Sequence, residues 1–377
     1  MKIAALVDFP YWEGNVGTAI RIESLCQSLA KVCDLTVVSS VTLHSGHQSF
    51  AEDAPYRLID RQTLKEIDKR LTGIVYPRVR KDRLSTVRSV AEFCRMENFD
   101  AVLTPYFNRD WMAEHIPPET LRIVDTIDCQ SQRTRSFAAH GLTPTFPMTA
   151  AAEGKQLDRY DIALAISDED HDEFTQITRT PVITAPFRLP VNDLYRVRAN
   201  ANELLFIAAK SDVNDMSLAY LLRDVLPLVD RPVRLNIVGN VTVPEYRPAN
   251  TEVICHERIE DLREIYTKVD LALNPTYAGG GVKTKTLEAI AHGVPVISSD
   301  EGARGLHHLL PEPLIVNDKE QFAYVTGLLL DNNRLRARLS QQMMANLASE
   351  AKEDWLDPFL HMARAARAAK LEAAAAR

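Results

Sequence analysis

Three glycines and two lysines form the stretch of this chain that is best suited to chemistry. Gly279, Gly280 and Gly281 follow an apolar run, and a helix is expected to begin near Val282, with Lys283 and Lys285 in its first turn. Two cations there oppose the positive end of the helix dipole unless an anion occupies the site. Glycines permit close approach to the backbone, and free N–H groups at a helix start bind phosphate oxygens. The stretch therefore predicts a diphosphate pocket.

A carboxylate on the same expected helix extends this pocket. Lys285 and Glu288 are three residues apart, so they share one helix face. Glu288 could grip a ribose by its two hydroxyls while Lys285 faces the phosphates. The spacing fits equally well an ordinary surface ion pair beside a plain glycine loop.

The first half of the chain carries two further candidates. Gly14 and Gly17 join the first expected strand to the first helix, where backbone N–H groups could meet a phosphate or a sugar; a simple tight turn is the alternative. Asp125 and Asp128 stand at the end of a strand, and Asp128 could orient a hydroxyl substrate or accept its proton. Equally, Asp128 could cap the next helix or pair with a neighbouring arginine. The glycine spacing disfavours NAD binding.

These residues need strands and helices to position them, and the apolar pattern provides both. Short runs rich in Val, Ile and Leu alternate with stretches of helical period, as in parallel sheets covered by crossover helices. On the helix expected at Thr18 to Lys31, the apolar face includes Ile22 and Leu25, and Arg21 is expected to point elsewhere. The predicted strands are Lys2 to Asp8, Asp34 to Ser39, Ala101 to Pro105, Arg122 to Ile127, Ile162 to Ser167, Val182 to Ala185, Leu204 to Ala208, Arg234 to Val238, Glu252 to Cys255, Leu271 to Asn274, Pro295 to Ser298 and Leu314 to Val316.

This alternation predicts an α/β chain with two Rossmann-like domains. The first spans residues 1–187, a linker without apolar period spans 188–202, and the second spans 203–350. The Ala- and Arg-rich tail, 351–377, is expected to be a helix or a frayed end. Open parallel sheets bind ligands beyond the carboxyl ends of their strands, so we expect two facing sheets with the site in the cleft between them.

Composition narrows the class of partner. The 377 residues are 46% hydrophobic and 25% charged, an ordinary balance for a globular protein. A net charge of -7 provides no global field for nucleic acid. The five cysteines form no Cys-x-x-Cys pair and suggest no metal site, so reduced thiols and a cytoplasmic location are expected. No signal peptide or membrane span is predicted.

One basic stretch stands out against the acidic chain. It runs from Lys69 to Arg95, and Arg78, Arg80, Lys81 and Arg83 could touch an anionic inner membrane or an anionic lipid-linked substrate. A solvated helix face is the alternative.

The segment Asn274 to Leu306 resembles the C-terminal nucleotide-sugar motif of family 4 retaining glycosyltransferases, also called glycosyl transferases group 1. The resemblance rests on the run Glu288-Ala289-Ile290-Ala291-His292-Gly293-Val294-Pro295-Val296-Ile297 and extends through Asp261 to Asp270, Asn236-Ile237-Val238-Gly239 and, more loosely, Phe206 to Asn214. It implies the GT-B fold of two facing Rossmann-like domains, a nucleotide sugar held mainly by the second domain, and no obligatory metal. By that resemblance Glu288 would contact the ribose, and Lys283 or Lys285 the diphosphate.

Two departures from the family pattern concern the donor. Many members carry a second glutamate where Gly280 stands here, and many place an Arg and a Lys after the first strand of the second domain, where only Lys210 remains, followed by Asn214. The expected donor site comprises Gly14, Gly17, Lys210, Gly280, Gly281, Val282, Lys283, Lys285 and Glu288, with Asp128 and Lys285 as catalytic residues.

The resemblance implies transfer of a sugar from a nucleotide sugar to a hydroxyl acceptor: a glycan, a lipid-linked sugar or a small molecule. Retention of configuration, a role in polysaccharide biosynthesis and no cofactor beyond the donor are expected with it. Two alternatives stay open. One is a catalytically silent GT-B protein that binds a nucleotide or a partner subunit, and the other is a nucleotide-sugar epimerase on the same fold.

Overall fold

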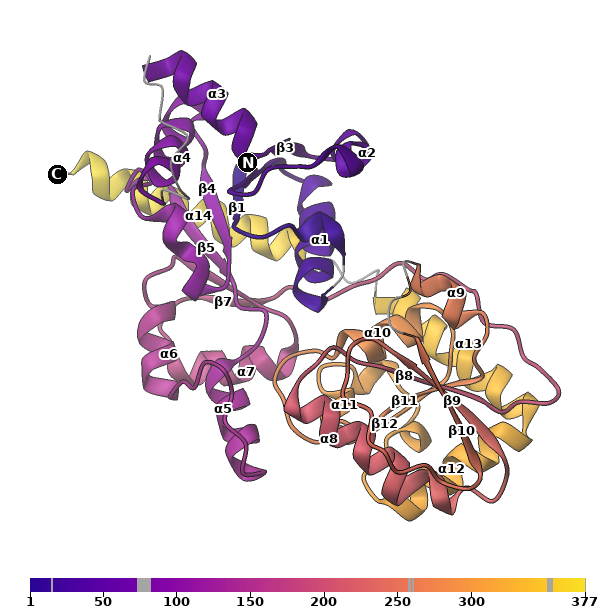
Figure 1. Cartoon of the computed structure of the whole chain (residues 1–377). Helices are drawn as coiled ribbons and strands as arrows, with labels where there is room; N and C mark the ends of the chain where they lie inside the picture. Colours follow the sequence, from indigo (N-terminus) through magenta and orange to yellow (C-terminus); the bar gives the residue numbers. More distant parts are fainter. Residues whose placement is uncertain (15, 73–82, 257–258, 260, 351–354, 377) are drawn as a thin grey trace. The chain divides into compact units, whose positions relative to one another are not determined.

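The computed structural model describes residues 1–14, 16–72, 83–256, 259, 261–350 and 355–376 (Figure 1). The chain divides into two compact units. Unit 1 comprises Met1–Gln132, Phe146–Phe187 and Asp354–Arg377, and unit 2 comprises Arg133–Thr145 and Arg188–Glu353. Among the described residues no helix is long and apolar enough to cross a membrane.

Unit 1 is built on a parallel sheet in the order β3-β2-β1-β4-β5-β6-β7. Six of these strands lie where the apolar runs predict them, with ends that differ by at most two residues. The sequence prediction missed β3, which has only three residues. The strands are β1 Lys2–Val7, β2 Asp34–Ser39, β3 Arg57–Ile59, β4 Ala101–Pro105, β5 Leu121–Asp125, β6 Ile162–Ala165 and β7 Val182–Thr184.

Helices cover both faces of this sheet. Alternate residues of β1 enter opposite apolar clusters, since successive strand side chains point to opposite faces. Ile3 and Ala5 pack in the same cluster as α1 and α14, whereas Ala4 and Leu6 pack with α4. The unit 1 helices are α1 Gly17–Ala30, α2 Gln48–Asp53, α3 Arg61–Thr72, α4 Arg83–Glu97, α6 Ala150–Leu157, α7 Asp168–Ile177 and α14 Leu356–Ala375, and α5 Gln130–Ala139 begins at its boundary.

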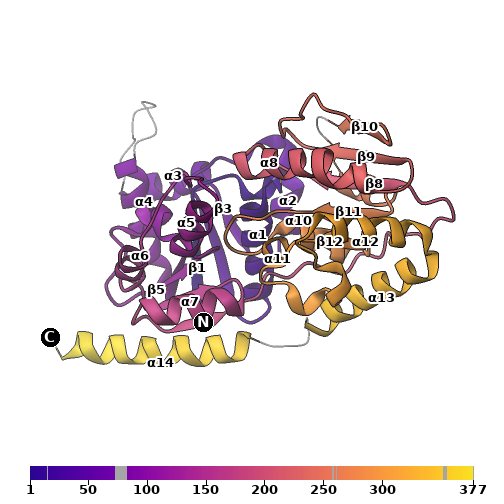
Figure 2. The ribbon, with the colours of Figure 1, turned by 90° about the horizontal axis from the view of Figure 1, so that it is seen from below.

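The C-terminal tail is a helix that belongs to unit 1. Phe359, Leu360 and Ala363 of α14 are buried in the cluster that also holds Ile22 and Leu25 of α1. Figure 2 shows α14 as a long separate helix along its unit. The last part of the chain therefore completes the core formed by the first part.

The prediction for Arg21 on α1 is wrong. This side chain is 1% exposed and donates from Nη2 to Oδ1 of Asp125 at 2.8 Å and from Nη1 to the carbonyl of Pro186 at 3.1 Å. Position 21 lies next to Ile22, at the edge of the apolar stripe, and the buried Asp125 supplies the compensating charge that lets an arginine stand there.

Unit 2 contains a second parallel sheet in the order β10-β9-β8-β11-β12. Its strands are β8 Glu203–Ile207, β9 Val233–Val238, β10 Thr251–His256, β11 Leu271–Asn274 and β12 Val296–Ser298. The predicted strand Leu314 to Val316 is wrong: Ile315 makes only an isolated parallel bridge with Ser298, after a 3-10 turn at Glu312–Leu314. Two prolines near this segment remove donors that a strand would need.

The helices of unit 2 are α8 Asp212–Tyr220, α9 Leu262–Tyr266, α10 Thr284–Ala291, α11 Asp300–Ala303, α12 Lys319–Asp331 and α13 Asn333–Glu350. In both sheets the first strand lies beside the fourth, β1 beside β4 and β8 beside β11. The connections that leave two such neighbours diverge, and the crevice at their carboxyl ends is where open parallel sheets hold ligands. The carboxyl edges of the two sheets are therefore where functional residues are expected.

Candidate functional site

The glycine turn of unit 2 follows β11 at the carboxyl edge of the sheet. Helix α10 begins at Thr284, so Lys283 stands at its N-cap and not in its first turn as predicted. Gly281 has a φ of +59°, in the left-handed region that favours glycine. The sequence therefore supplies a turn that brings the backbone, rather than side chains, to the helix start.

Lys283 is turned into this loop. Its ammonium donates to Oε1 of Glu301 at 2.7 Å and to the carbonyls of Gly280 at 3.3 Å and Gly281 at 3.2 Å. Lys283 and Glu301 are 12% and 17% exposed, so this ion pair is largely shielded from water. Sequence analysis did not find Glu301, although its position just after β12 puts it at the same strand edge.

A buried polar network fixes the loop to the sheet. The amide of Asn274 at the end of β11 donates to Oγ1 of Thr286 at 2.7 Å, and that hydroxyl donates to the carbonyl of Gly302 at 2.9 Å. A Cβ on Gly302 would meet the carbonyl oxygen of Asn274 at 2.6 Å, so a glycine is required for this close approach. The network holds β11, α10 and α11 in one register.

Lys285 is held by the first strand and helix of unit 2. Its Nζ donates to Oδ1 of Asn214 on α8 at 2.9 Å and lies 5.2 Å from the ring centroid of Phe206 on β8. Burial lowers the pKa of Lys285 to about 7, and the nearby charge of Lys283 adds to the effect. An anion placed here would meet a lysine that gains its charge when the anion binds.

Glu288 lies one turn further along α10. Burial raises the pKa of its carboxyl to about 7. The alternative of a surface ion pair with Lys285 does not describe this structure, because the Lys285 ammonium bonds Asn214. Nδ1 of His292 donates to the carbonyl of Glu288 at 2.7 Å, and the His292 ring stacks on the ring of Tyr266 with 4.4 Å between centroids at this end of the helix.

Lys210 is exposed, and it follows β8 as predicted. Its backbone N–H donates to Oδ1 of Asn240 at 2.8 Å. Gly239, which precedes Asn240, has a φ of +108°, and a Cβ there would meet the carbonyl oxygen of Ala208 at 2.3 Å. The structure thus brings Lys285, Lys283, Glu288 and the glycine turn to one edge of unit 2, with Lys210 on the neighbouring loop after β8.

Asp128 occupies the carboxyl edge of the unit 1 sheet, two residues after Thr126. The hydroxyl of Tyr106 donates to its carboxylate at 2.6 Å, and the amide of Gln130 donates to the same oxygen. Asp128 is 6% exposed. Tyr106 and Ile127 both have a φ of +62°, an outlier for a branched residue such as Ile127. Strain of this kind is maintained at sites where geometry matters.

The start of α5 is capped by a residue that sequence analysis missed. Glu153, fully buried, accepts from the backbone N–H groups of Gln130 at 2.7 Å and Ser131 at 2.8 Å. The helix start therefore has its own carboxylate, supplied from α6 rather than by Asp128. A buried glutamate 23 residues downstream of the helix start leaves no local sequence signal.

Gly14 lies between β1 and α1 as predicted, and Gly17 is the first residue of α1. Gly14 has a φ of +59° and no atom within 4 Å of the place where a Cβ would stand, so the turn needs glycine for its backbone conformation. Helix α1 begins at Gly17, and Asn15 lies outside the described residues. The buried Tyr11, whose hydroxyl is 3.1 Å from that of Tyr56, anchors the loop before Gly14.

Three residues of the predicted membrane contact, Arg78, Arg80 and Lys81, also lie outside the described residues, and the side chain of Arg83 is not described. Membrane contact stays a prediction.

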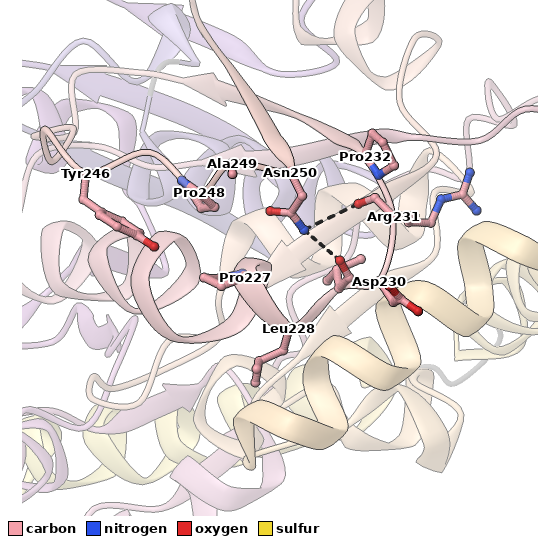
Figure 3. Close-up of a pocket in the computed structure, with 10 residues that line it drawn as sticks. Pro227, Leu228, Asp230, Arg231, Pro232, Tyr246, Pro248, Ala249 and Asn250 are labelled. Carbon is pink, nitrogen blue, oxygen red and sulfur yellow. Dashed lines mark hydrogen bonds between the residues drawn. The ribbon is translucent and has the colours of Figure 1, made fainter.

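A surface hollow of about 810 Å³ lies elsewhere on unit 2 (Figure 3). It is lined by Pro232 and Asn250, which directly precede β9 and β10, and by Tyr246. The amide of Asn250 donates to the carbonyl of Val229, another lining residue, at 2.7 Å. This is the amino edge of the sheet, so the hollow is separate from the candidate site.

The second half of the chain matches a family of known proteins. Residues 201–332 match the family described as Glycosyl transferases group 1. Among curated proteins, no sequence matches this chain significantly. The match covers β8 to α12 and so includes the glycine turn, Lys285 and Glu288.

Solved structures resemble the whole chain. A sucrose-phosphate synthase from Thermosynechococcus elongatus superposes with a TM-score of 0.65 at 15% identity, covering 99% of this chain and 100% of that chain. TarM of S. aureus gives 0.70 at 10% identity over 96% and 98%. HepE of Anabaena, solved with UDP and glucose, gives 0.59 at 12% identity over 97% and 99%.

These comparisons confirm the predicted resemblance to glycosyl transferases group 1 in the second half of the chain, and they confirm the GT-B fold class. Together they support the prediction that the chain is a glycosyltransferase.

Proposed function

We propose that this chain transfers a sugar from a nucleotide sugar to a hydroxyl acceptor with retention of configuration and without an obligatory metal. The observation that carries the proposal is the clustering of the glycine turn, Lys285 and Glu288 at the carboxyl edge of the unit 2 sheet. HepE, a structural neighbour, was also solved with UDP-glucose, a nucleotide sugar, which is the class of donor expected here.

In this proposal the diphosphate lies against the glycine turn and beside Lys285. Negative charge grows on the departing phosphate as the sugar leaves, and preorganised donors aimed at that charge stabilise the transition state. Lys285 is suited to this role because its lowered pKa places proton uptake near neutral pH. Glu288 would accept hydrogen bonds from the ribose hydroxyls.

The acceptor hydroxyl would attack from the side on which the phosphate departs, and the phosphate itself can take the proton. Asp128, fixed by Tyr106 and Gln130, would orient the acceptor hydroxyl. The bond that breaks is the sugar–phosphate bond, and the bond that forms joins the sugar to the acceptor oxygen. No covalent enzyme intermediate is needed.

The test is thermal unfolding with a panel of nucleoside diphosphates and nucleotide sugars. A ligand at about 100 times its dissociation constant stabilises the folded chain by about 2.7 kcal/mol, which corresponds to a shift of several degrees. We expect a selective shift that Glu288→Ala abolishes and that the control Glu320→Ala, on the exposed face of α12, retains. The absence of a shift with any nucleotide would refute the proposal.

Product analysis then separates the enzymatic possibilities. A transferase releases nucleoside diphosphate in the presence of acceptor and hydrolyses its donor slowly without it. An epimerase would return an altered nucleotide sugar, and a silent partner subunit would release nothing.

A further inference from the structure

The ion pair between Lys283 and Glu301 has a role that the family resemblance does not assign. Family 4 members are expected to use a lysine at this helix start to bind the diphosphate. Here the Lys283 ammonium already has three acceptors: Oε1 of Glu301 and the carbonyls of Gly280 and Gly281. Three acceptors satisfy all three N–H groups of an ammonium. In this arrangement Lys283 has no donor left for a phosphate.

The two carbonyls that Lys283 binds determine where the backbone N–H groups point. A planar trans peptide directs its C=O and its N–H in opposite directions. Carbonyls of Gly280 and Gly281 that face Lys283 therefore turn the N–H groups of Gly281 and Val282 away from it. Within the described part of the chain, these two N–H groups donate to no protein acceptor.

An unpartnered N–H group in a buried residue is costly, and Gly281 is buried. Two adjacent N–H groups of this kind form a concave site for an anionic oxygen. The glycines leave room for it: a Cβ on Gly279 would lie 2.9 Å from Nζ of Lys283 and 3.2 Å from Oε1 of Glu301, so a side chain there would collide with the ion pair.

We propose that Glu301 is a positioning residue, which locks Lys283 into the turn and thereby aims the Gly281 and Val282 N–H groups at the diphosphate. The inference rests on the proposed function and assigns the diphosphate contact to these N–H groups and to Lys285. Lys283 then acts on the backbone and not on the ligand.

The direction in which Glu301→Ala changes nucleotide affinity distinguishes this positioning role from direct binding of the diphosphate by Lys283. If Lys283 bound the diphosphate directly, removal of the Glu301 carboxylate would free the ammonium and tighten binding. If the ion pair positions the backbone, Glu301→Ala releases the turn and weakens binding, although it removes a negative charge beside the anion. We expect the dissociation constant to rise about tenfold, the size of a lost hydrogen bond to a charged group.

The experiment measures the affinity of the full chain for UDP, ADP and GDP by calorimetry. Glu301→Gln keeps an oxygen that can accept from Lys283, so its affinity should stay within about threefold of the wild type. Asp300→Ala is the matched control, because Asp300 precedes Glu301 on α11, is 70% exposed and contacts His307. Its affinity should not change.

A double-mutant cycle completes the test. Lys283→Met and Glu301→Ala break the same lock, so the double variant should bind no more weakly than either single variant. Unchanged or tighter binding by Glu301→Ala would overturn the inference, as would additive effects of opposite sign. If Glu301→Ala does not fold, tighter binding by Glu301→Gln overturns it in the same way. A wild-type chain that binds none of the three nucleotides refutes the proposed function instead.

Discussion

Nucleotide affinity should depend steeply on pH because of Lys285. Burial lowers the pKa of this lysine to about 7, so the ammonium predominates below neutral pH and the neutral amine above it. An anion stabilises the ammonium, so binding takes up a proton wherever free Lys285 is neutral. If only the ammonium form binds, the dissociation constant rises by about 25-fold between about pH 6.5 and pH 8.5.

The assay is isothermal titration of a nucleoside diphosphate over this pH range, in buffers of different ionisation enthalpy that report proton uptake. Glu288, with a pKa raised to about 7, loses its proton over the same range. Its carboxylate, which is proposed to accept from the ribose hydroxyls, forms as the pH rises, so its effect on affinity opposes that of Lys285. The series is therefore repeated in Glu288→Gln, where Lys285 is left as the titrating group of the pair. There the pH dependence should be steeper than in the wild type.

Lys285→Met provides the control, because it keeps the length of the side chain and has no charge. Its affinity at low pH should be at least about tenfold weaker, and its affinity should no longer fall as the pH rises. A wild type with constant affinity across the range, or a Lys285→Met variant with the same slope, would refute the assignment of the diphosphate charge to Lys285.

Three further substitutions test the framework around the site. Arg21→Met should lower the free energy of unfolding in urea by about 3 to 5 kcal/mol, because it leaves the buried carboxylate of Asp125 without its partner. A double variant with Asp125→Leu should recover part of this loss. An unchanged urea midpoint of Arg21→Met would contradict the buried ion pair. Asp128→Asn should lower kcat by about 10- to 100-fold in a sugar-transfer assay with little change in nucleotide affinity. A change in nucleotide affinity alone would contradict the role of Asp128 in orienting the acceptor. Gly239→Ala should destabilise the chain by about 2 kcal/mol or more, measured by thermal unfolding. Gly46→Ala is the control and should be close to neutral, because the new Cβ meets no atom within 4 Å. Equal effects of the two substitutions would contradict the close approach of Gly239 to the carbonyl of Ala208.

The strands were predictable because a buried strand has a characteristic local composition. A strand covered on both faces must be apolar along its whole length. The apolar runs at β1, β2, β4 and β11 can therefore be recognised without knowing which strands pair with them. The exceptions have local causes. β3 is too short to give a pattern, and Leu314 to Val316 has the composition of a strand but stands beside prolines that prevent a continuous ladder.

The candidate site was partly predictable for the same reason. Glycines, lysines and a glutamate close together in sequence, at a strand-to-helix junction, predicted the turn and the helix that carries Lys285 and Glu288. The roles of these two residues stay predictions. These residues are close in sequence, so they stay close together in the folded chain. The exact start of α10 was not predictable, and its position at Thr284 puts Lys283 at the N-cap of the helix.

By itself the sequence determined the two sets of parallel strands, the glycine turn and the residues at the end of each strand, because each depends on neighbours within about one helical turn or one strand. Only the tertiary structure decided which distant groups meet. Glu301 on α11 accepts from Lys283, Glu153 on α6 accepts from the start of α5, and Asp125 accepts from Arg21 on α1. Ion pairs and caps of this kind form when separate elements converge on one strand edge, and the energy of burying a charge with a partner depends on that convergence and not on spacing along the chain.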